Sequence, residues 1–228
     1  MKKKVAIFDI DGTIFRSSLL IEVTESLVYE GVFPLKVRDI YTKSYNNWLN
    51  RKGSYEKYIG EVINAFEQNM KNIKYVDFVK ASKNVIAFHK SRVYRYTRQI
   101  VKDLKKKNYF MLAISNSPKE LVDDFCSNLG FDKVYGRVYE VGKNGKFTGK
   151  TLYLDLVSDK AKILQRAVEK EGLTLKGSIG VGDTESDIKF LKLVQRPICF
   201  NPNKKLYNHA KSVGWEIVVE RKDVIYKI

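Results

Sequence analysis

The sequence predicts an α/β fold: a doubly wound, mostly parallel, Rossmann-like sheet with a small helical domain inserted after the first strand, plus a β-hairpin. Three short apolar runs carry this prediction, and they span residues 5–8, 109–114 and 178–181. Their apolar residues are continuous rather than alternating, as in strands buried on both faces of a parallel sheet. Helical patterns alternate with these runs, at residues 92–107, 119–129 and 160–171. This alternation indicates βα units wound around one sheet.

The segment after the first strand has a different character. From residue 13 to about residue 86 the pattern is helical and contains no clear parallel strand. We therefore expect a separate helical domain at residues 16–86. The remaining residues, 1–15 and 87–228, are expected to form the core around the sheet.

Two further strand signals lie later in the chain. Residues 137–155 alternate around Asn144-Gly145, and Asn-Gly is the strongest two-residue hairpin signal. A fourth short strand of the parallel sheet is expected at residues 197–200. The hairpin is interpreted as a flap.

An aromatic stripe marks the middle of the helical insertion. Tyr41, Tyr45 and Trp48 follow one another at spacings of four and three, which places them on one face of a helix. They can form the core of the insertion or a surface that contacts a substrate. We favour the core.

Composition limits the classes of partner. The chain has 228 residues and a formal net charge of +16, so it attracts anions such as phosphorylated metabolites, nucleic acid or acidic lipid surfaces. No apolar stretch approaches the ~20 residues of a membrane span. Cys126 and Cys199 lie in apolar surroundings and provide no disulfide framework, which favours buried thiols and a cytoplasmic protein.

Polar residues follow each of the three apolar runs. The first run leads into Asp9 and Asp11, the second into Ser115 and Asn116, and the third into a loop that begins with Asp183. Ligands of open parallel sheets bind beyond the carboxyl ends of the strands. We therefore expect these three loops to converge on one site.

Asp9 and Asp11 are suited to different roles. Asp9 ends the strand and can attack phosphorus, while Asp11 can protonate the leaving oxygen and later activate water. Two turn-forming aspartates are an equally good explanation of this pair in isolation. With the other loops, the pair also suits Mg²⁺, which prefers oxygen ligands; Asp9, Asp183 and the carbonyl of Asp11 suffice as protein ligands.

Phosphate can be held by the second loop and by a lysine. The hydroxyl of Ser115 and the backbone amide of Asn116 can bind a phosphoryl oxygen, and Lys160 can balance the developing negative charge. Lys162 competes for the lysine role, since it lies two residues further along the same predicted helix. Lys160 is preferred.

These loops resemble the four signature motifs of the haloacid dehalogenase superfamily, over about residues 4–215. The motifs are Asp9-Ile10-Asp11-Gly12-Thr13, Ser115, Lys160 and the segment Gly182-Asp183-Thr184-Glu185-Ser186-Asp187. The helical insertion after the first motif resembles the cap of the phosphoserine phosphatase-like branch. The resemblance implies a hydrolase with Asp9 as nucleophile, Asp11 as general acid and base, Ser115 and Lys160 as phosphate binders and Asp183 as magnesium ligand. It also implies that Asp187 is a carboxylate that supports the metal ligands.

The expected function is magnesium-dependent hydrolysis of a small phosphate monoester through an aspartyl-phosphate. The alternatives are a nucleic-acid end phosphatase and a non-catalytic module that binds anions or nucleic acid; a helical cap favours the small substrate over nucleic acid. Phosphoserine is not the expected substrate. The resembling phosphoserine phosphatases carry a glutamate nine residues after the nucleophile, where this chain has Ser18, although Glu22 lies one helical turn further on.

Overall fold

The computed structural model describes residues 2–228, which form two compact units. Unit one comprises the chain through Arg16 together with Ser91–Arg137 and Tyr153–Ile228. Unit two comprises Ser17–Lys90 and Val138–Leu152. The first unit contains the parallel sheet, and the second contains the helical insertion.

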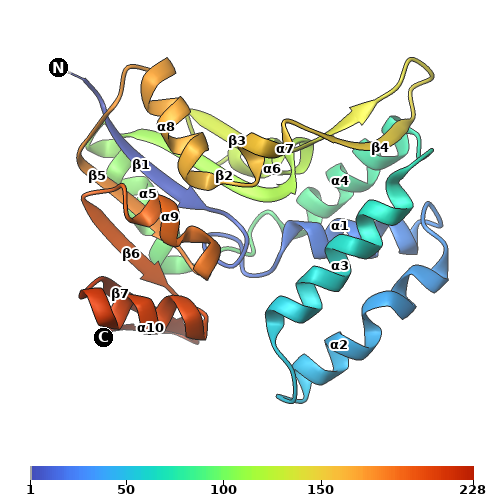
Figure 1. Cartoon of the computed structure of the whole chain (residues 1–228), viewed down its shortest axis with the longest axis horizontal. Helices are drawn as coiled ribbons and strands as arrows, with labels where there is room; N and C mark the ends of the chain where they lie inside the picture. Colours follow the sequence, from blue (N-terminus) through green and yellow to red (C-terminus); the bar gives the residue numbers. More distant parts are fainter. Residues whose placement is uncertain (1) are drawn as a thin grey trace. The chain divides into compact units, whose positions relative to one another are not determined.

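The predicted parallel sheet is confirmed, in the order β4-β3-β2-β1-β5-β6-β7-β8 (Figure 1). Every pairing from β3 to β7 is parallel, whereas β3–β4 and β7–β8 are antiparallel. The strands of unit one are β1 (Lys4–Asp9), β2 (Phe110–Pro118), the first part of β3 (Lys133–Val141), β5 (Thr174–Gly182), β6 (Arg196–Phe200), β7 (Glu216–Arg221) and β8 (Val224–Lys227). From Val138 onward β3 belongs to unit two. The sequence predicted β1, β2, β5 and β6, but it did not predict β7 and β8 or the parallel start of β3.

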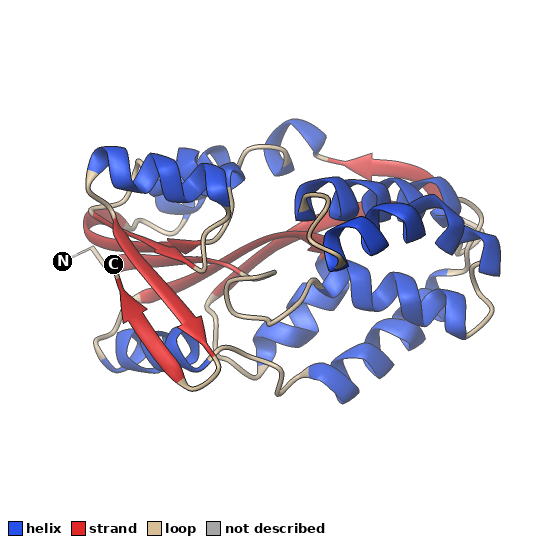
Figure 2. Cartoon of the chain, turned by 90° about the horizontal axis from the view of Figure 1, so that it is seen from below, coloured by secondary structure: helices blue, strands red, loops and turns tan. Residues whose placement is uncertain are grey.

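Helices cover both faces of this sheet, as a doubly wound fold requires (Figure 2). Val5 and Ile7 of β1 pack in one buried cluster with residues of α8, α9 and α10. Phe15, just after β1, packs edge to face on Phe125 of α6. The helices of unit one are α5 (Arg95–Lys106), α6 (Lys119–Ser127), α7 (Leu154–Val157), α8 (Lys160–Lys170), α9 (Ile188–Leu191) and α10 (Lys204–Val213), with the 3₁₀ turn η2 (Glu185–Asp187).

Unit two is a helical unit with a hairpin. Its elements are α1 (Leu19–Tyr29), the 3₁₀ turn η1 (Leu35–Arg38), α2 (Asp39–Leu49), α3 (Tyr55–Met70), α4 (Tyr75–His89) and β4 (Phe147–Leu152). The predicted hairpin is confirmed, because the second half of β3 pairs antiparallel with β4.

The hairpin packs with the helices of unit two, whereas the sequence analysis had assigned it to the core. Tyr139 and Phe147 explain this difference. The Tyr139 ring lies 5.5 Å from that of Phe66, and the Phe147 ring lies 5.4 Å from that of Phe78. All four rings are buried, so the hairpin completes the apolar core of the helical unit.

The aromatic stripe of α2 packs within the insertion, but only Tyr41 lies in its core as favoured. Tyr41 is buried, and Trp48 stacks on Tyr58 of α3 at 5.7 Å. Tyr45 also packs on Tyr58 but keeps a partly exposed edge. Among the described residues, both cysteines are free and buried, as expected. None of the described helices has the length and apolarity of a membrane-spanning segment.

Candidate active site

The first loop of the site is shaped by a glycine. Asp9 is the last residue of β1 and is buried, while Asp11 follows in the turn. Gly12 has φ of 78°, in the left-handed region that favours glycine. A β-carbon at Gly12 would lie 2.1 Å from Oδ2 of Asp183. The absence of a side chain at Gly12 therefore lets the first and last loops of the site approach each other.

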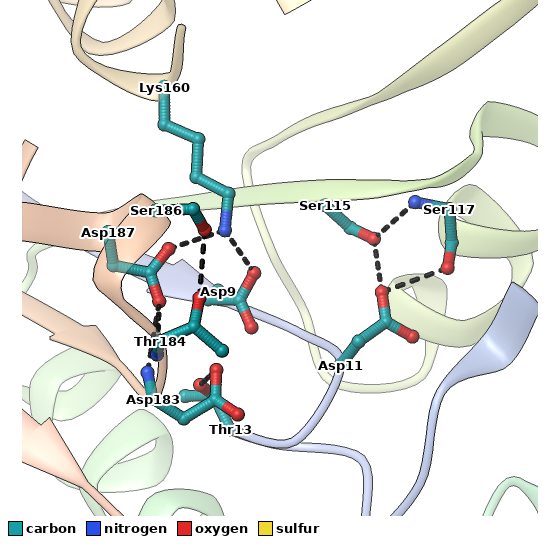
Figure 3. Close-up of polar contacts among 10 residues, drawn as sticks. All are labelled: Asp9, Asp11, Thr13, Ser115, Ser117, Lys160, Asp183, Thr184, Ser186 and Asp187. Carbon is teal, nitrogen blue, oxygen red and sulfur yellow. Dashed lines mark hydrogen bonds and ion pairs between the residues drawn. The ribbon is translucent and has the colours of Figure 1, made fainter. Parts of the chain in front are cut away.

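A buried lysine joins two carboxylates in this site (Figure 3). Nζ of Lys160 lies 2.5 Å from Oδ1 of Asp9 and 2.5 Å from Oδ1 of Asp187. Lys160 is the first residue of α8, and Asp159 caps that helix by accepting a hydrogen bond from the amide of Ala161. The helix start thus fixes the backbone from which the lysine reaches Asp9.

The loop after β5 is organised by Asp187. Its Oδ2 accepts hydrogen bonds from the amides of Asp183, at 3.0 Å, and Thr184, at 3.1 Å. A β-carbon at Gly182 would lie 2.6 Å from the same oxygen, so this close approach requires glycine. The hydroxyl of Thr13 donates to Oδ1 of Asp183 at 3.3 Å. Asp183 is therefore held from both its backbone and its side chain.

Three carboxylates gather where these loops meet. Asp9, Asp183 and Asp187 each offer an oxygen, and these oxygens all lie within 4.8 Å of one another. Burial raises the pKa of Asp9 to about 7, against the attraction of Lys160 and with added repulsion from Asp187 and Asp11. Burial, followed by the charges of Asp9 and Asp187, also raises the pKa of Asp183 well above its ordinary value. The charged forms of these carboxylates are therefore disfavoured in the site as it stands, and a bound cation would stabilise them.

The donor set fits Mg²⁺, which binds oxygen ligands and usually needs only one or two protein carboxylates. Asp187 already accepts hydrogen bonds on both carboxylate oxygens, from Lys160 and from two backbone amides. Asp9 and Asp183 are consequently the better ligands, and Asp187 holds the residues around them. The supporting role of Asp187 stays a prediction.

Lys160 carries a firmly held positive charge. Burial alone lowers the pKa of a lysine, but the nearby charges of Asp187 and Asp9 outweigh burial and raise the pKa of Lys160 above its ordinary value. Lys162 is exposed and lies on a different face of α8. Of the two lysines left open by the sequence, Lys160 is the one in the site.

A second group of hydrogen bonds surrounds Asp11. Its Oδ2 accepts hydrogen bonds from the hydroxyl of Ser115, at 2.5 Å, and from that of Ser117, at 2.9 Å. The amide of Ser117 donates to the Ser115 hydroxyl oxygen at 2.9 Å. Figure 3 shows the Asp11 carboxylate turned toward these serines and away from Lys160. Asp11 and Ser115 are thus brought together, beside the Asp9 cluster.

Two contributors to the site, Ser117 and Thr13, were not assigned a role from the sequence. Ser115 and Ser117 are two apart on β2 and project to the same side of the strand, and Asn116 between them is exposed. That alternation is visible in the sequence and provides a signal for Ser117. Thr13 is buried, and its carbonyl accepts a hydrogen bond from Thr97, a contact no sequence pattern indicates.

Comparison with known proteins shows the family of this chain. A family model described as haloacid dehalogenase-like hydrolase matches residues 6–192. Among curated proteins, a histidinol-phosphatase of Neisseria meningitidis is 24% identical over 95% of this chain and 98% of its own length. A phosphoserine phosphatase of Methanocaldococcus jannaschii is 24% identical over 98% of this chain and 95% of its own.

Solved structures show the same fold. A protein of unknown function from Bordetella pertussis has a TM-score of 0.72 at 15% identity, covering 95% of this chain and 98% of its own. A phosphoserine phosphatase, solved as a phospho-aspartyl intermediate analogue, has a TM-score of 0.65 at 22% identity, covering 98% and 96%.

Proposed function

This chain belongs to the haloacid dehalogenase-like hydrolases, and on that premise we propose that it is a magnesium-dependent phosphatase of small phosphate monoesters. Its similarity to a histidinol-phosphatase and to phosphoserine phosphatases supports the phosphate monoester as substrate class. An aspartyl-phosphate on Asp9 is the proposed intermediate.

The observation that carries this proposal is the buried contact of Lys160 with Asp9. A nucleophilic carboxylate that attacks an anionic phosphate needs positive charge beside it, because two anions otherwise repel each other. Lys160 lies 2.5 Å from Oδ1 of Asp9, and both side chains are almost completely buried. Burial of a charged lysine is costly unless it is paired, and Lys160 is paired with both Asp9 and Asp187, so its charge is held beside the proposed nucleophile.

Mg²⁺ would be held by Asp9 and Asp183, with the carbonyl of Asp11 as the remaining protein ligand. When bound, the ion supplies screening of the phosphate charge and orients the phosphoryl group toward the nucleophile. Burial, together with repulsion from the neighbouring carboxylates, raises the pKa of Asp9 and Asp183, and a cation at this place would relieve both costs.

The reaction proceeds in two balanced steps. A carboxylate oxygen of Asp9 forms a bond to phosphorus, the bond from phosphorus to the ester oxygen breaks, and Asp11 gives that oxygen a proton. Water then attacks phosphorus, Asp11 takes a proton from it, and the bond between Asp9 and phosphorus breaks. The products are an alcohol and inorganic phosphate, and both aspartates return to their starting states.

Phosphate binding is assigned to the second loop and to the lysine. The Ser115 hydroxyl and the backbone amide of Asn116 bind phosphoryl oxygens, and Lys160 balances the charge that develops on them. The Ser115 hydroxyl donates to Oδ2 of Asp11, so the two loops lie close together, which supports a phosphate held by both of them.

The helical insertion supports a small substrate, and the cysteines support a cytoplasmic protein. Unit two has the chain position of a helical cap, which favours a small substrate over nucleic acid. Both cysteines are free and buried, and burial raises the pKa of Cys199 to about 12, which fits unreactive thiols in the cytoplasm.

The test is hydrolysis of p-nitrophenyl phosphate by purified protein with Mg²⁺ or with excess chelator. Asp9→Asn is expected to abolish turnover, because an amide is a poor nucleophile. Asp11→Asn is expected to lower turnover by ~100- to 10,000-fold, because it removes the base that activates water for the second step. Asp124→Asn, an exposed aspartate of α6, is the matched control. Normal turnover by Asp9→Asn contradicts the proposal. Retention of DNA without any hydrolysis would instead favour a binding module.

A further inference from the structure

Ser117 donates to the oxygen of Asp11 that also receives the Ser115 hydroxyl. The two bonds, at 2.5 Å from Ser115 and 2.9 Å from Ser117, both end on Oδ2. Both serines are buried, with 4% and 2% of their surface exposed. Buried hydroxyls with charged partners make strong, oriented hydrogen bonds. The pair therefore fixes the direction in which the Asp11 carboxyl points.

Ser115 cannot keep this bond throughout the proposed reaction. A serine hydroxyl has a single proton to donate. In the structure that proton goes to Asp11, and the Ser115 oxygen accepts from the Ser117 amide. When a phosphoryl oxygen binds Ser115, the proton goes to the phosphate and the bond to Asp11 is lost. Of the two hydroxyls, Ser117 is then the one still donating to Asp11.

We propose that Ser117 is a positioning residue for the general acid: its hydroxyl retains Oδ2 of Asp11 while Ser115 turns to the substrate phosphate. This inference rests on the proposed function, since it needs Asp11 to protonate the leaving oxygen. An oxygen that accepts hydrogen bonds is the poorer carrier of a transferable proton, so Oδ1 carries it. Ser117 thus orients the carboxyl so that Oδ1 faces the leaving group.

This role has a kinetic signature that a purely structural serine lacks. Protonation of the leaving oxygen matters most for an alkyl phosphate, whose alkoxide leaves poorly without a proton. It matters least for p-nitrophenyl phosphate, whose phenolate leaves unaided. The parameter to compare is kcat/KM, because it includes the step in which the leaving group departs. Loss of the Ser117 hydroxyl should therefore lower kcat/KM mainly for the alkyl phosphate.

The experiment measures kcat/KM of Ser117→Ala for p-nitrophenyl phosphate and for propyl phosphate. We expect a loss of ~10-fold or more with the alkyl phosphate, because Asp11 becomes charged as it gives up its proton and a hydrogen bond to a charged group is strong, and under ~3-fold with the aryl phosphate. Ser117→Thr, which keeps the hydroxyl, should have a kcat/KM for propyl phosphate close to that of wild type. Ser127→Ala, an exposed serine at the end of α6, is the control and should match wild type.

The outcomes separate this inference from the proposed function. Equal losses with both substrates, or none with either, overturn the positioning role of Ser117. Asp11→Asn must itself lose more activity with the alkyl phosphate, and if it does not, the proposed function fails instead. Ser117→Cys keeps the side-chain volume and weakens the donor, so it gives the same test if Ser117→Ala does not fold.

Discussion

Replacing Lys160 with methionine should destabilise the protein strongly at neutral pH. The substitution keeps an unbranched side chain of similar size and removes the charge. Lys160 is 6% exposed, as is Asp9, and Asp187 is completely buried. Lys160→Met therefore leaves two buried carboxylates without their shared cation.

The burial of Lys160, Asp9 and Asp187 decides how much free energy of unfolding the substitution costs. An exposed ion pair contributes ~0–1 kcal/mol, but removing one partner of a buried pair costs about 3–5 kcal/mol. The cost for a buried pair applies here, because both partners of Lys160 are buried. It is on the order of half of the 5–15 kcal/mol by which domains are typically stable. Lys162→Met removes an exposed lysine of the same helix and should change the free energy of unfolding by less than ~0.5 kcal/mol.

The loss of stability caused by Lys160→Met should increase with pH. The pKa of Asp9 is about 7 in the folded protein against an ordinary 3.8, so between these values the folded state binds a proton that the unfolded chain releases. The contribution of Asp9 to stability is therefore fully present below about pH 4 and is lost as pH rises through about 7. Without Lys160 the pKa of Asp9 should rise further, so the variant's loss of stability should be smaller at pH 5, where Asp9 is protonated, than at pH 8.

The assay is urea unfolding of wild type, Lys160→Met and Lys162→Met in chelator, at pH 5 and pH 8. The expected result is a deficit for Lys160→Met that is larger at pH 8. Equal stability of the two variants at pH 8 would refute the reasoning, because it would mean that the buried carboxylates do not need the lysine.

Three further outcomes follow from the same structure. Magnesium should support turnover and calcium little, because the larger, looser coordination of calcium misplaces phosphate and nucleophile; a phosphate-release assay with each ion checks this. Phosphoserine should not be the preferred substrate in kcat/KM across a panel of phosphate monoesters, since Ser18 is neutral and Glu22 lies 3.2 Å from His89. Glu120 has a buried, unpartnered Oε2, and burial raises its pKa, so its contribution to stability is present below its unfolded pKa and lost as pH rises through the folded one. Glu120→Gln should therefore gain stability over wild type in thermal unfolding at pH 8 and not at pH 4.

The sequence predicted the part of the site that depends on strand ends. Asp9, Ser115 and Asp183 follow continuous apolar runs, and parallel strands place such residues at one edge of the sheet. The same reasoning failed for β7 and β8, whose charged residues such as Glu220 and Lys227 hide the pattern of a buried strand. Those strands form because β7 pairs with β6, a long-range contact that local sequence does not encode.

Side-chain partners were the harder part to predict. A helical pattern alone did not decide between Lys160 and Lys162, since that depends on how α8 is rotated against the sheet. The hairpin was recognised from Asn144-Gly145, but its packing with the helical unit depends on Tyr139 and Phe147 meeting rings distant in sequence. Such contacts are decided by tertiary packing, which sequence periodicity does not specify.

The central claim is that Asp9 becomes phosphorylated, and chemical trapping tests it most directly. Protein mixed with substrate and Mg²⁺ is quenched in acid within a turnover and treated with borohydride, which reduces an aspartyl-phosphate to homoserine. Mass spectrometry of the peptide containing residue 9 should find homoserine at Asp9, and none in Asp9→Asn or without substrate. An unmodified Asp9 under active turnover, or a phosphoryl group on another residue, would contradict the account.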